Sequence, residues 1–329
     1  MRELRDTVKI VALAGGVGGA KLVYGLAKIL TPKELVIIVN TGDDFDYHGL
    51  RICPDLDTIC YTLAGLSNPE SGWGRDKESW NFLTELKRLS IEDWFQVGDK
   101  DLATHVYRTN ELKKGVSLHE IVNNLCNSWD IEHQILPMSD HKVATIIDTM
   151  EHGEIPFQEY FVKYKYNPII KKIRFECKVD PAPTPGLVSA IKESDAVILC
   201  PSNPWLSIDP ILSIPEINLT IKQKPTVAIS PIIEGKALKG PAAKIFSELG
   251  IPPSSAAIAR HYEGIINSLF IDHKDINEFD DIQRIGVTPF VTNTIMKTNH
   301  ERVQLAKDVL NYIKEELLIT NDFLGNHSC

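Results

Sequence analysis

Short apolar segments alternate with amphipathic segments along most of the chain. Val8–Leu13 and Leu35–Asn40 are rich in β-branched and other apolar residues, as expected for strands buried on both faces of a parallel sheet. Between them, Ala20–Leu30 repeats apolar residues at helical spacing. The order strand, glycine-rich loop, helix and strand predicts a βαβ unit near the start of the chain.

The same alternation continues into the C-terminal part of the chain. Periodicity predicts further helices at Asp57–Leu66, Lys77–Leu89, Leu118–Trp129, Leu187–Lys192 and Glu301–Leu318. It predicts further strands at Ile131–Pro137, Val143–Asp148, Phe157–Phe161, Ala196–Leu199 and Thr226–Ser230. The segments Ser254–Tyr262 and Ser268–Asp272 extend the alternation, and a turn rich in proline, serine and asparagine spans Cys200–Asp209.

This organisation predicts an α/β fold with a Rossmann-like core, a mostly parallel sheet and an additional α/β region. No low-complexity linker or internal repeat divides the chain. We therefore expect a single α/β catalytic domain over residues 1–318, with an inserted region around 140–185. Residues 319–329 show no periodicity, and we expect them to form a flexible tail.

Composition and charge exclude several classes of protein. The net charge of −9 disfavours a sequence-independent grip on nucleic acid, which needs a basic face. No segment approaches the roughly 18 consecutive apolar residues of a membrane-spanning helix. The N-terminal segment lacks the apolar core of a signal peptide, so we expect a cytoplasmic protein without membrane partners. The cysteines form no CxxC pair, which disfavours a zinc site.

A glycine-rich loop follows the first predicted strand. Gly15, Gly16, Gly18 and Gly19 precede Lys21 in a sequence that matches neither the dinucleotide fingerprint nor the Walker A motif. Glycines nevertheless allow the backbone to approach an anion, and the amides of a new helix point at it. The loop predicts phosphate binding, and the alternative is a tight strand-to-helix turn without a ligand.

An acidic stretch follows the second predicted strand. Asp43, Asp44 and Asp46 come directly after it, and Asp55 and Asp57 flank the start of a helix. Carboxylates at a strand end are a common way to hold Mg²⁺ against substrate phosphates, so the stretch predicts a magnesium site. The alternative is that Asp55 or Asp57 caps the following helix.

Further polar groups follow in three later segments. Asp101, His105 and Arg108 would share one face of a helix, which suits a polyphosphate or, equally, a capped helix with a solvated face. The loops after two later strands contain Ser202, Asn203 and Lys236, which can contact phosphate, although a rigid turn is the alternative for the first of them. These segments support a phosphate-binding edge of the sheet.

Taken in order, these segments resemble the 2-phospho-L-lactate transferase family of deazaflavin coenzyme F-420 biosynthesis. The similarity extends from Val8 to about Lys314. It rests on "GGVGGAKL", "VNTGDDFDYHGLRICPDLDTICYTLAG", "GWGRDKESWN", "GDKDLATHVYR", "LPMSDHKVATII", "PSNPWLSIDPIL" and "SPIIEGKALKGPAAK". The form of the acidic stretch is similar to the bacterial branch of the family.

The resemblance implies a reaction and its components. It implies Mg²⁺-dependent transfer of a phospho-three-carbon-acid group, 2-phospholactate or phosphoenolpyruvate, from a GDP-linked donor to the ribityl hydroxyl of the deazaflavin Fo. GMP leaves, and the protein is often a homodimer. The resemblance also implies catalytic metal ligands at Asp43 and Asp57, with Asp55 in reserve, and Fo contacts at Asp57 and Lys100. It leaves open whether Asp57 binds the metal, Fo or both.

Two other functions compete with this one. A sugar-nucleotide-binding regulatory protein of similar fold shares a glycine-rich N-terminal loop but does not explain the aspartates at positions 55 and 57. A nicotinamide-dependent oxidoreductase is disfavoured by the broken fingerprint. No motif distinguishes lactate, enolpyruvate and glycerate as the acid of the donor.

Overall fold

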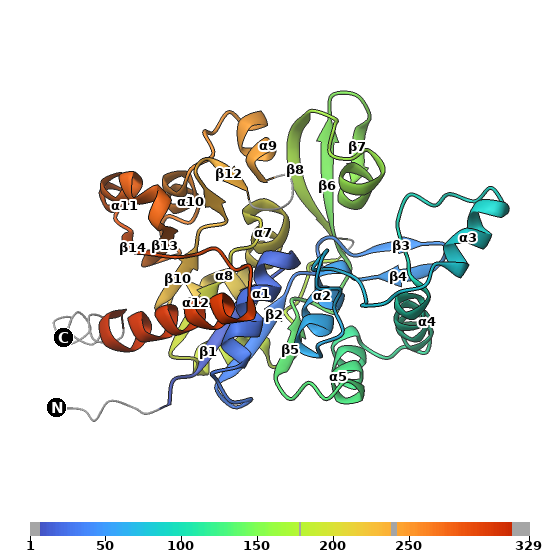
Figure 1. Ribbon diagram of the computed structural model, residues 1–329, viewed down its shortest axis with the longest axis horizontal. Coiled ribbons are helices and arrows are strands. Elements are labelled where there is room, and N and C mark those ends of the chain that lie inside the picture. Colours follow the sequence, from blue (N-terminus) through green and yellow to red (C-terminus); the bar gives the residue numbers. More distant parts are fainter. Residues whose placement is uncertain (1–6, 178, 238–241, 318–329) are drawn as a thin grey trace.

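A seven-stranded parallel sheet forms the centre of the molecule (Figure 1). The computed structural model describes residues 7–177, 179–237 and 242–317. The strand order is β14-β13-β10-β9-β1-β2-β5, and every neighbouring pair is parallel. The strands are β1 (Ile10–Ala14), β2 (Leu35–Val39), β5 (Gln134–Pro137), β9 (Ala196–Leu199), β10 (Thr226–Ile229), β13 (Ser268–Asp272) and β14 (Thr288–Thr292). The predicted α/β class is confirmed.

The side chains of β1 divide between two hydrophobic cores, one on each face of the sheet. Ile10, Ala12 and Ala14 belong to one core, and Val11 and Leu13 belong to the other. This period of two explains why the strand is apolar throughout: both of its faces are covered.

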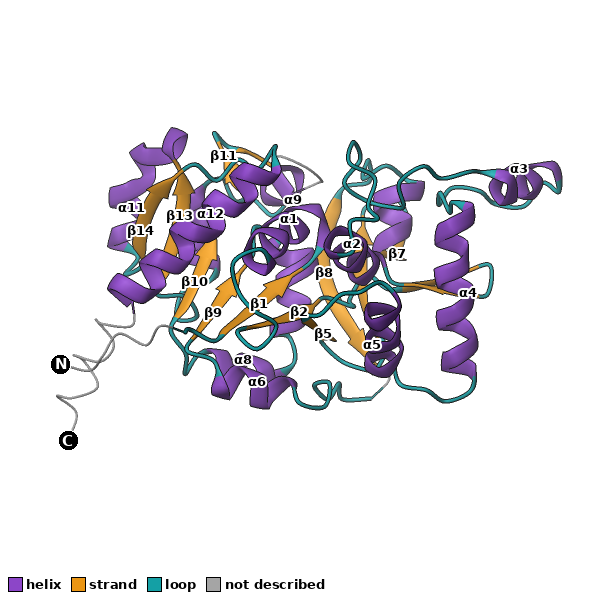
Figure 2. Ribbon diagram, turned by 60° about the horizontal axis from the view of Figure 1, so that its bottom comes forward, coloured by secondary structure: helices purple, strands orange, loops and turns teal. Residues whose placement is uncertain are grey.

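Helices cover both faces (Figure 2). One core receives residues from α1 (Gly16–Ala27), α2 (Pro54–Leu63), α5 (Leu118–Ser128) and α12 (Asn299–Tyr312). The other receives residues from α6 (Leu187–Glu193), α7 (Asp209–Leu212), α8 (Pro215–Ile221), α9 (Ala242–Glu248), α10 (Ser255–His261) and α11 (Phe279–Arg284). Among the described helices, none is both long and apolar enough to cross a membrane.

Two smaller units flank the sheet. The hairpin of β3 (Phe45–Tyr47) and β4 (Leu50–Ile52) leads towards α3 (Asn81–Arg88) and α4 (Asp99–Lys113), which lie on the side away from β14 (Figure 1). The strands β6 (Val143–Thr149), β7 (Gly153–Pro156) and β8 (Ile170–Cys177) form a separate antiparallel sheet. These three strands lie within the region that the sequence predicts as an insertion.

Short elements complete the chain, and several bounds differ from the predicted ones. The hairpin β11 (Ile232–Ile233) and β12 (Lys236–Ala237) follows β10. Short π-helical turns form η1 (Glu159–Lys163), η2 (Pro204–Ile208) and η4 (Ile313–Leu317), and a 3-10 helix forms η3 (His273–Glu278). The predicted tail lies outside the described residues.

Two predicted elements are wrong in part or entirely. The segment Phe157–Phe161 is helical and not a strand, and its residues Phe157, Tyr160 and Phe161 are spaced for one face of a helix. The predicted helix from Lys77 begins only at Asn81, since Lys77 has a φ of 52°, which a helix does not accommodate.

Candidate functional site

The predicted polar loops meet at one edge of the sheet. Because β9, β1 and β2 are parallel neighbours, their carboxyl ends lie side by side (Figure 2). The glycine loop follows β1, the acidic stretch follows β2 and the loop with Ser202 follows β9. Open α/β sheets bind ligands at this edge.

Close packing explains part of the glycine content of the first loop. A Cβ atom on Gly18 would overlap the carbonyl oxygen of Pro201, and one on Gly19 would lie 2.6 Å from the Ser202 hydroxyl oxygen. The Gly15 amide donates to that hydroxyl oxygen at 3.1 Å, and the hydroxyl donates to the Gly15 carbonyl at 2.8 Å. Ser202 therefore fastens the loop after β9 to the loop after β1.

The first turn of α1 opens directly onto the acidic stretch. Gly16 has a φ of 59°, a left-handed conformation that favours glycine, and its amide donates to a carboxylate oxygen of Asp55 at 2.7 Å. The first-turn amides of a helix have no partner within the helix, so this end of α1 attracts negative charge. In this structure Asp55 satisfies one of those amides.

A buried asparagine joins two of the predicted metal ligands. The side-chain amide of Asn40, at the end of β2, donates to Asp43 at 3.1 Å and to Asp55 at 2.9 Å. Gln158, at the start of η1, donates from its side-chain amide to Asp43 at 3.2 Å. Sequence reasoning missed Asn40 and Gln158. Asn40 directly follows β2 and lies three residues before Asp43, and this position in the sequence could have identified it as a site residue.

Burial disfavours the ionised form of three aspartates. Burial raises the pKa of Asp43 well above its ordinary value, and the charges of Asp55 and Asp44 raise it further. Burial raises the pKa of Asp55 to about 6, against the hydrogen bonds from Asn40 and Gly16. Burial raises the pKa of Asp44 to about 7, although Arg51 and the weakly donating Cys53 thiol act against the rise.

Asp44 is the least satisfied member of this group. In the described part of the chain, neither of its carboxylate oxygens has a nitrogen or oxygen donor, although both are buried. Buried carboxylate oxygens that lack a polar donor are ligands that a hard divalent cation such as Mg²⁺ prefers. We call Asp43, Asp44 and Asp55 the acidic cluster.

Asp57 has a different contact partner from the acidic cluster. It lies in the first turn of α2, and the guanidinium of Arg108 on α4 contacts both of its carboxylate oxygens, with Nη1 to Oδ2 at 3.2 Å and Nη2 to Oδ1. Arg108 is 1% exposed, and Asp57 raises its pKa despite burial. Arg108 and Asp57 therefore form a buried ion pair.

The predicted shared face of α4 is confirmed, but it points into the protein. The His105 ring lies between two carboxylates, with Nδ1 3.7 Å from Asp57 and Nε2 3.2 Å from Asp101. Asp101 also accepts a hydrogen bond of 2.6 Å from the Tyr61 hydroxyl. This face of α4 is neither a surface that a polyphosphate could contact nor a solvated face, because Arg108 and His105 are buried.

This face contains another set of metal-ligating side chains. Ligand atoms of Asp57, Asp101 and His105 lie within 4.8 Å of one another, and no other such triplet occurs among the described residues. However, Arg108 already contacts both oxygens of Asp57, and its charge repels a cation. We therefore favour the acidic cluster as the place for Mg²⁺.

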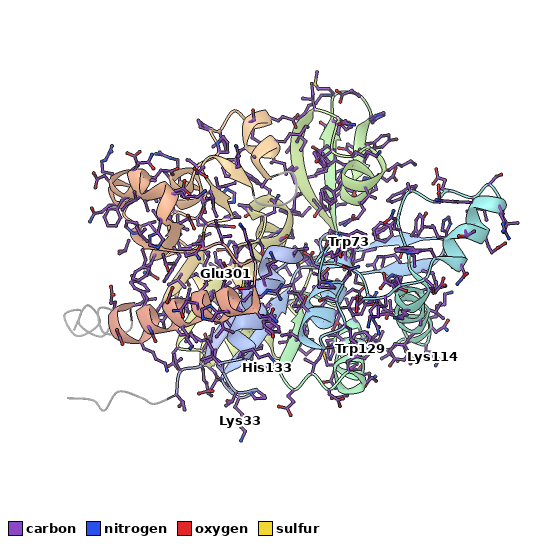
Figure 3. All side chains as sticks on the ribbon, viewed as in Figure 1. Lys33, Trp73, Lys114, Trp129, His133 and Glu301 are labelled. Atoms are coloured by element: carbon purple, nitrogen blue, oxygen red, sulfur yellow. The ribbon has the colours of Figure 1, made fainter. Side chains whose placement is uncertain are left out.

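A cavity of about 200 Å³ opens beside the first turn of α4. Its lining includes Trp73, Arg75, Trp80 and Asp101 (Trp73 is labelled in Figure 3). The ammonium group of Lys100 donates to the carbonyl oxygens of residues 76 and 77, both at 2.8 Å, and thereby holds the segment between the lining residues Arg75 and Glu78. The segment "GWGRDKESWN" supports the family resemblance, but the sequence did not predict its tryptophans as site residues.

The other predicted phosphate ligands, Asn203, Lys21 and Lys236, lie on three different elements. The side-chain oxygen of Asn203 accepts from the amides of Trp205 at 3.1 Å and Leu206 at 3.2 Å, so it caps η2. Lys21 lies half-buried in α1, and Lys236 lies exposed at the start of β12. Their binding roles stay predictions.

Comparisons with known proteins agree with the resemblance. The family model described as 2-phospho-L-lactate transferase CofD matches residues 10–316. A phosphoenolpyruvate transferase of Streptomyces griseus is 35% identical over 315 residues, covering 94% of this chain and 99% of its own. A 2-phospho-L-lactate transferase of Methanococcus maripaludis is 35% identical over 310 residues, covering 93% and 99%.

Among solved structures, a UPF0052 family protein from Bacillus halodurans superimposes with a TM-score of 0.61. The alignment covers 93% of this chain and 99% of the other, at 14% identity. At 14% identity that likeness concerns the fold alone, whereas the family model matches residues 10–316 and the relatives above are 35% identical. This chain therefore belongs to the 2-phospho-L-lactate transferase CofD family.

Proposed function

We propose that this protein transfers a phospho-three-carbon-acid group from its GDP-linked donor to the terminal ribityl hydroxyl of the deazaflavin Fo. A new bond forms between the hydroxyl oxygen and the phosphorus that bears the acid. The bond from that phosphorus to GMP breaks, GMP leaves, and the hydroxyl proton is lost. The observation that carries the proposal is the acidic cluster beside the glycine loop, at the edge where parallel strands end.

The acidic cluster supports a bound Mg²⁺. Asp43 and Asp55 would hold the ion, since Asn40 already brings both carboxylates to one amide nitrogen, and Asp44 lies close enough to raise the pKa of Asp43. When bound, the ion supplies positive charge that offsets the charge developing on the diphosphate. This assignment replaces Asp57 with Asp55 as the second ligand, because Arg108 already contacts both oxygens of Asp57.

The glycine loop supports binding of the donor diphosphate. The first turn of α1 presents amides towards the same edge as the acidic cluster, and one of them already contacts Asp55. Transfer of a phosphoryl-type group needs mainly alignment and charge stabilisation from the protein. Fixed amides and fixed carboxylates provide both without rearrangement.

The cavity beside α4 supports the acceptor site. Trp73 and Trp80 offer aromatic faces for a planar ring system, and Arg75 adds a cation. Lys100 would act on Fo by holding residues 76 and 77, which lie between the lining residues Arg75 and Glu78, or by direct contact once the ligand is bound. Asp57 would contact the acceptor hydroxyl, since a carboxylate offers about four acceptor positions and Arg108 uses two.

Three finer statements belong to the same proposal. The protein would act in the cytoplasm and as a homodimer, and its donor acid would be lactate or enolpyruvate, the acids named by its relatives. The sugar-nucleotide-binding regulator is not favoured, because the family match and the relatives support a transferase.

Titration calorimetry with Mg²⁺ tests the proposal against its alternatives. We expect GDP and Fo to bind with Mg²⁺ present, and a uridine sugar nucleotide and NAD to give no heat above dilution. Binding of the uridine sugar nucleotide without binding of Fo would contradict the proposal and favour the regulator.

A further inference from the structure

Arg108 ties three elements together at a single buried guanidinium. It contacts both carboxylate oxygens of Asp57 on α2, donates from Nη1 to the Arg51 carbonyl on β4 at 3.2 Å, and lies on α4 with His105 3.4 Å away. A planar fork of donors fixes a carboxylate in orientation as well as position. This contact therefore sets where Asp57 points relative to α4.

The same helix forms part of the acceptor cavity. Asp101 lines the cavity, and His105, one turn further along, lies between Asp101 and Asp57. Tyr61 on α2 donates to Asp101 at 2.6 Å and closes the link between the two helices. A continuous set of buried contacts thus connects the wall of the cavity to Asp57.

We propose that Arg108 is a positioning residue, which orients the carboxylate of Asp57 towards the acceptor hydroxyl rather than contacting substrate itself. The inference rests on the proposed function. Arg108 itself has almost no surface for a ligand, since it is 1% exposed. Because Arg108 contacts both carboxylate oxygens of Asp57, we expect its contribution to turnover to pass through that carboxylate and not through direct contact with the donor or the metal.

The test is a double-mutant cycle of Arg108→Lys and Asp57→Asn, measured by GMP release with Fo, a GDP-linked donor and Mg²⁺. Lysine keeps the charge and loses the fork. We expect Arg108→Lys to lower kcat about ten- to hundredfold, with the KM for the donor within about twofold of wild type. In the Asp57→Asn background, the same substitution should change kcat by less than about threefold.

A matched control distinguishes the loss of the two-point contact at Asp57 from a general effect of replacing an arginine by lysine. Arg174 makes a two-point pair with Glu154 on the second sheet, at 3.3 Å and 2.6 Å, and is part of no proposed site. Arg174→Lys should leave kcat and both KM values unchanged. Should Arg108→Lys fail to fold, the neutral pair Arg108→Gln with Asp57→Asn replaces it, and its kcat should match that of Asp57→Asn.

The outcomes separate this inference from the proposed function. Absence of turnover in the wild type overturns the proposed function and this inference with it. If the wild type turns over, two results overturn the positioning role alone. One is that the losses in kcat from the two substitutions are additive, and the other is that the KM for the donor rises by as large a factor as kcat falls. A non-additive loss confined to kcat and the KM for Fo supports it.

Discussion

Asp44→Asn should stabilise the metal-free protein, although it removes a charge from the proposed site. Asp44 is 4% exposed, and its oxygens have no nitrogen or oxygen donor among the described residues. Asparagine has nearly the same shape and carries no charge, so it removes the cost of burying a carboxylate. The substitution therefore separates what the residue does for stability from what it does for metal binding.

The magnitude follows from the pKa of Asp44, which burial raises from an ordinary 3.8 to about 7. At about 1.4 kcal/mol for each pKa unit, ionising this residue in the folded state costs up to about 4 kcal/mol at pH 8. The sign follows from proton binding, because between about pH 4 and pH 7 the folded state holds a proton that the unfolded state has lost. The residue's contribution to stability thus falls across that window and stays low above it.

Denaturant unfolding in EDTA at pH 5 and pH 8 measures the effect. We expect Asp44→Asn to raise the free energy of unfolding by about 2–4 kcal/mol at pH 8, allowing for local relaxation, and by clearly less at pH 5. The variant should also show a smaller rise in melting temperature with Mg²⁺ than the wild type. A loss of stability of the same size at both pH values would refute the reasoning, because it would mean that the carboxylate makes favourable contacts.

Four further substitutions test the site. Asp43→Asn and Asp55→Asn should each lower kcat more than about tenfold and reduce the Mg²⁺-dependent rise in melting temperature; unchanged values in both assays would place the metal elsewhere. Gly18→Ala should cost about 1–3 kcal/mol in denaturant unfolding, because its Cβ would overlap the Pro201 carbonyl, and should weaken GDP binding in calorimetry; wild-type stability would contradict the packing. Lys100→Ala should raise the KM for Fo while GDP affinity stays within about twofold, and the reverse result would make Lys100 a phosphate ligand.

The sequence was sufficient to predict the central strands and the glycine loop. Strands β1, β9 and β13 fall within or at the predicted segments, because strands covered on both faces must be apolar along their whole length. Strand β14 lies at the sheet edge, begins with Thr288 and Pro289 and has no continuous apolar run, so the hydrophobic pattern did not predict it. Phe157–Phe161 is a short aromatic segment, and over five residues the helical spacing of Phe157, Tyr160 and Phe161 does not outweigh the strand preference of aromatic residues.

The pairings within the site could not be derived from sequence spacing. Asp57 and Arg108 lie on different helices, and nothing in the local pattern indicates that they meet. Periodicity did predict that Asp101, His105 and Arg108 share a face of α4, but charged residues on a shared face are usually solvated. Only the packing of α4 against α2 and β4 explains why this face is buried.

Mass spectrometry of the complete reaction tests the central claim most directly. Fo and Mg²⁺ are incubated with the GDP-linked ester of lactate, enolpyruvate or glycerate in separate reactions, and both products are followed. The account predicts that at least one donor yields GMP and an equal amount of a phosphodiester of Fo, and that EDTA abolishes both. Hydrolysis of the donor without a phosphodiester, or no turnover of any donor by protein that binds Fo and GDP, would contradict it.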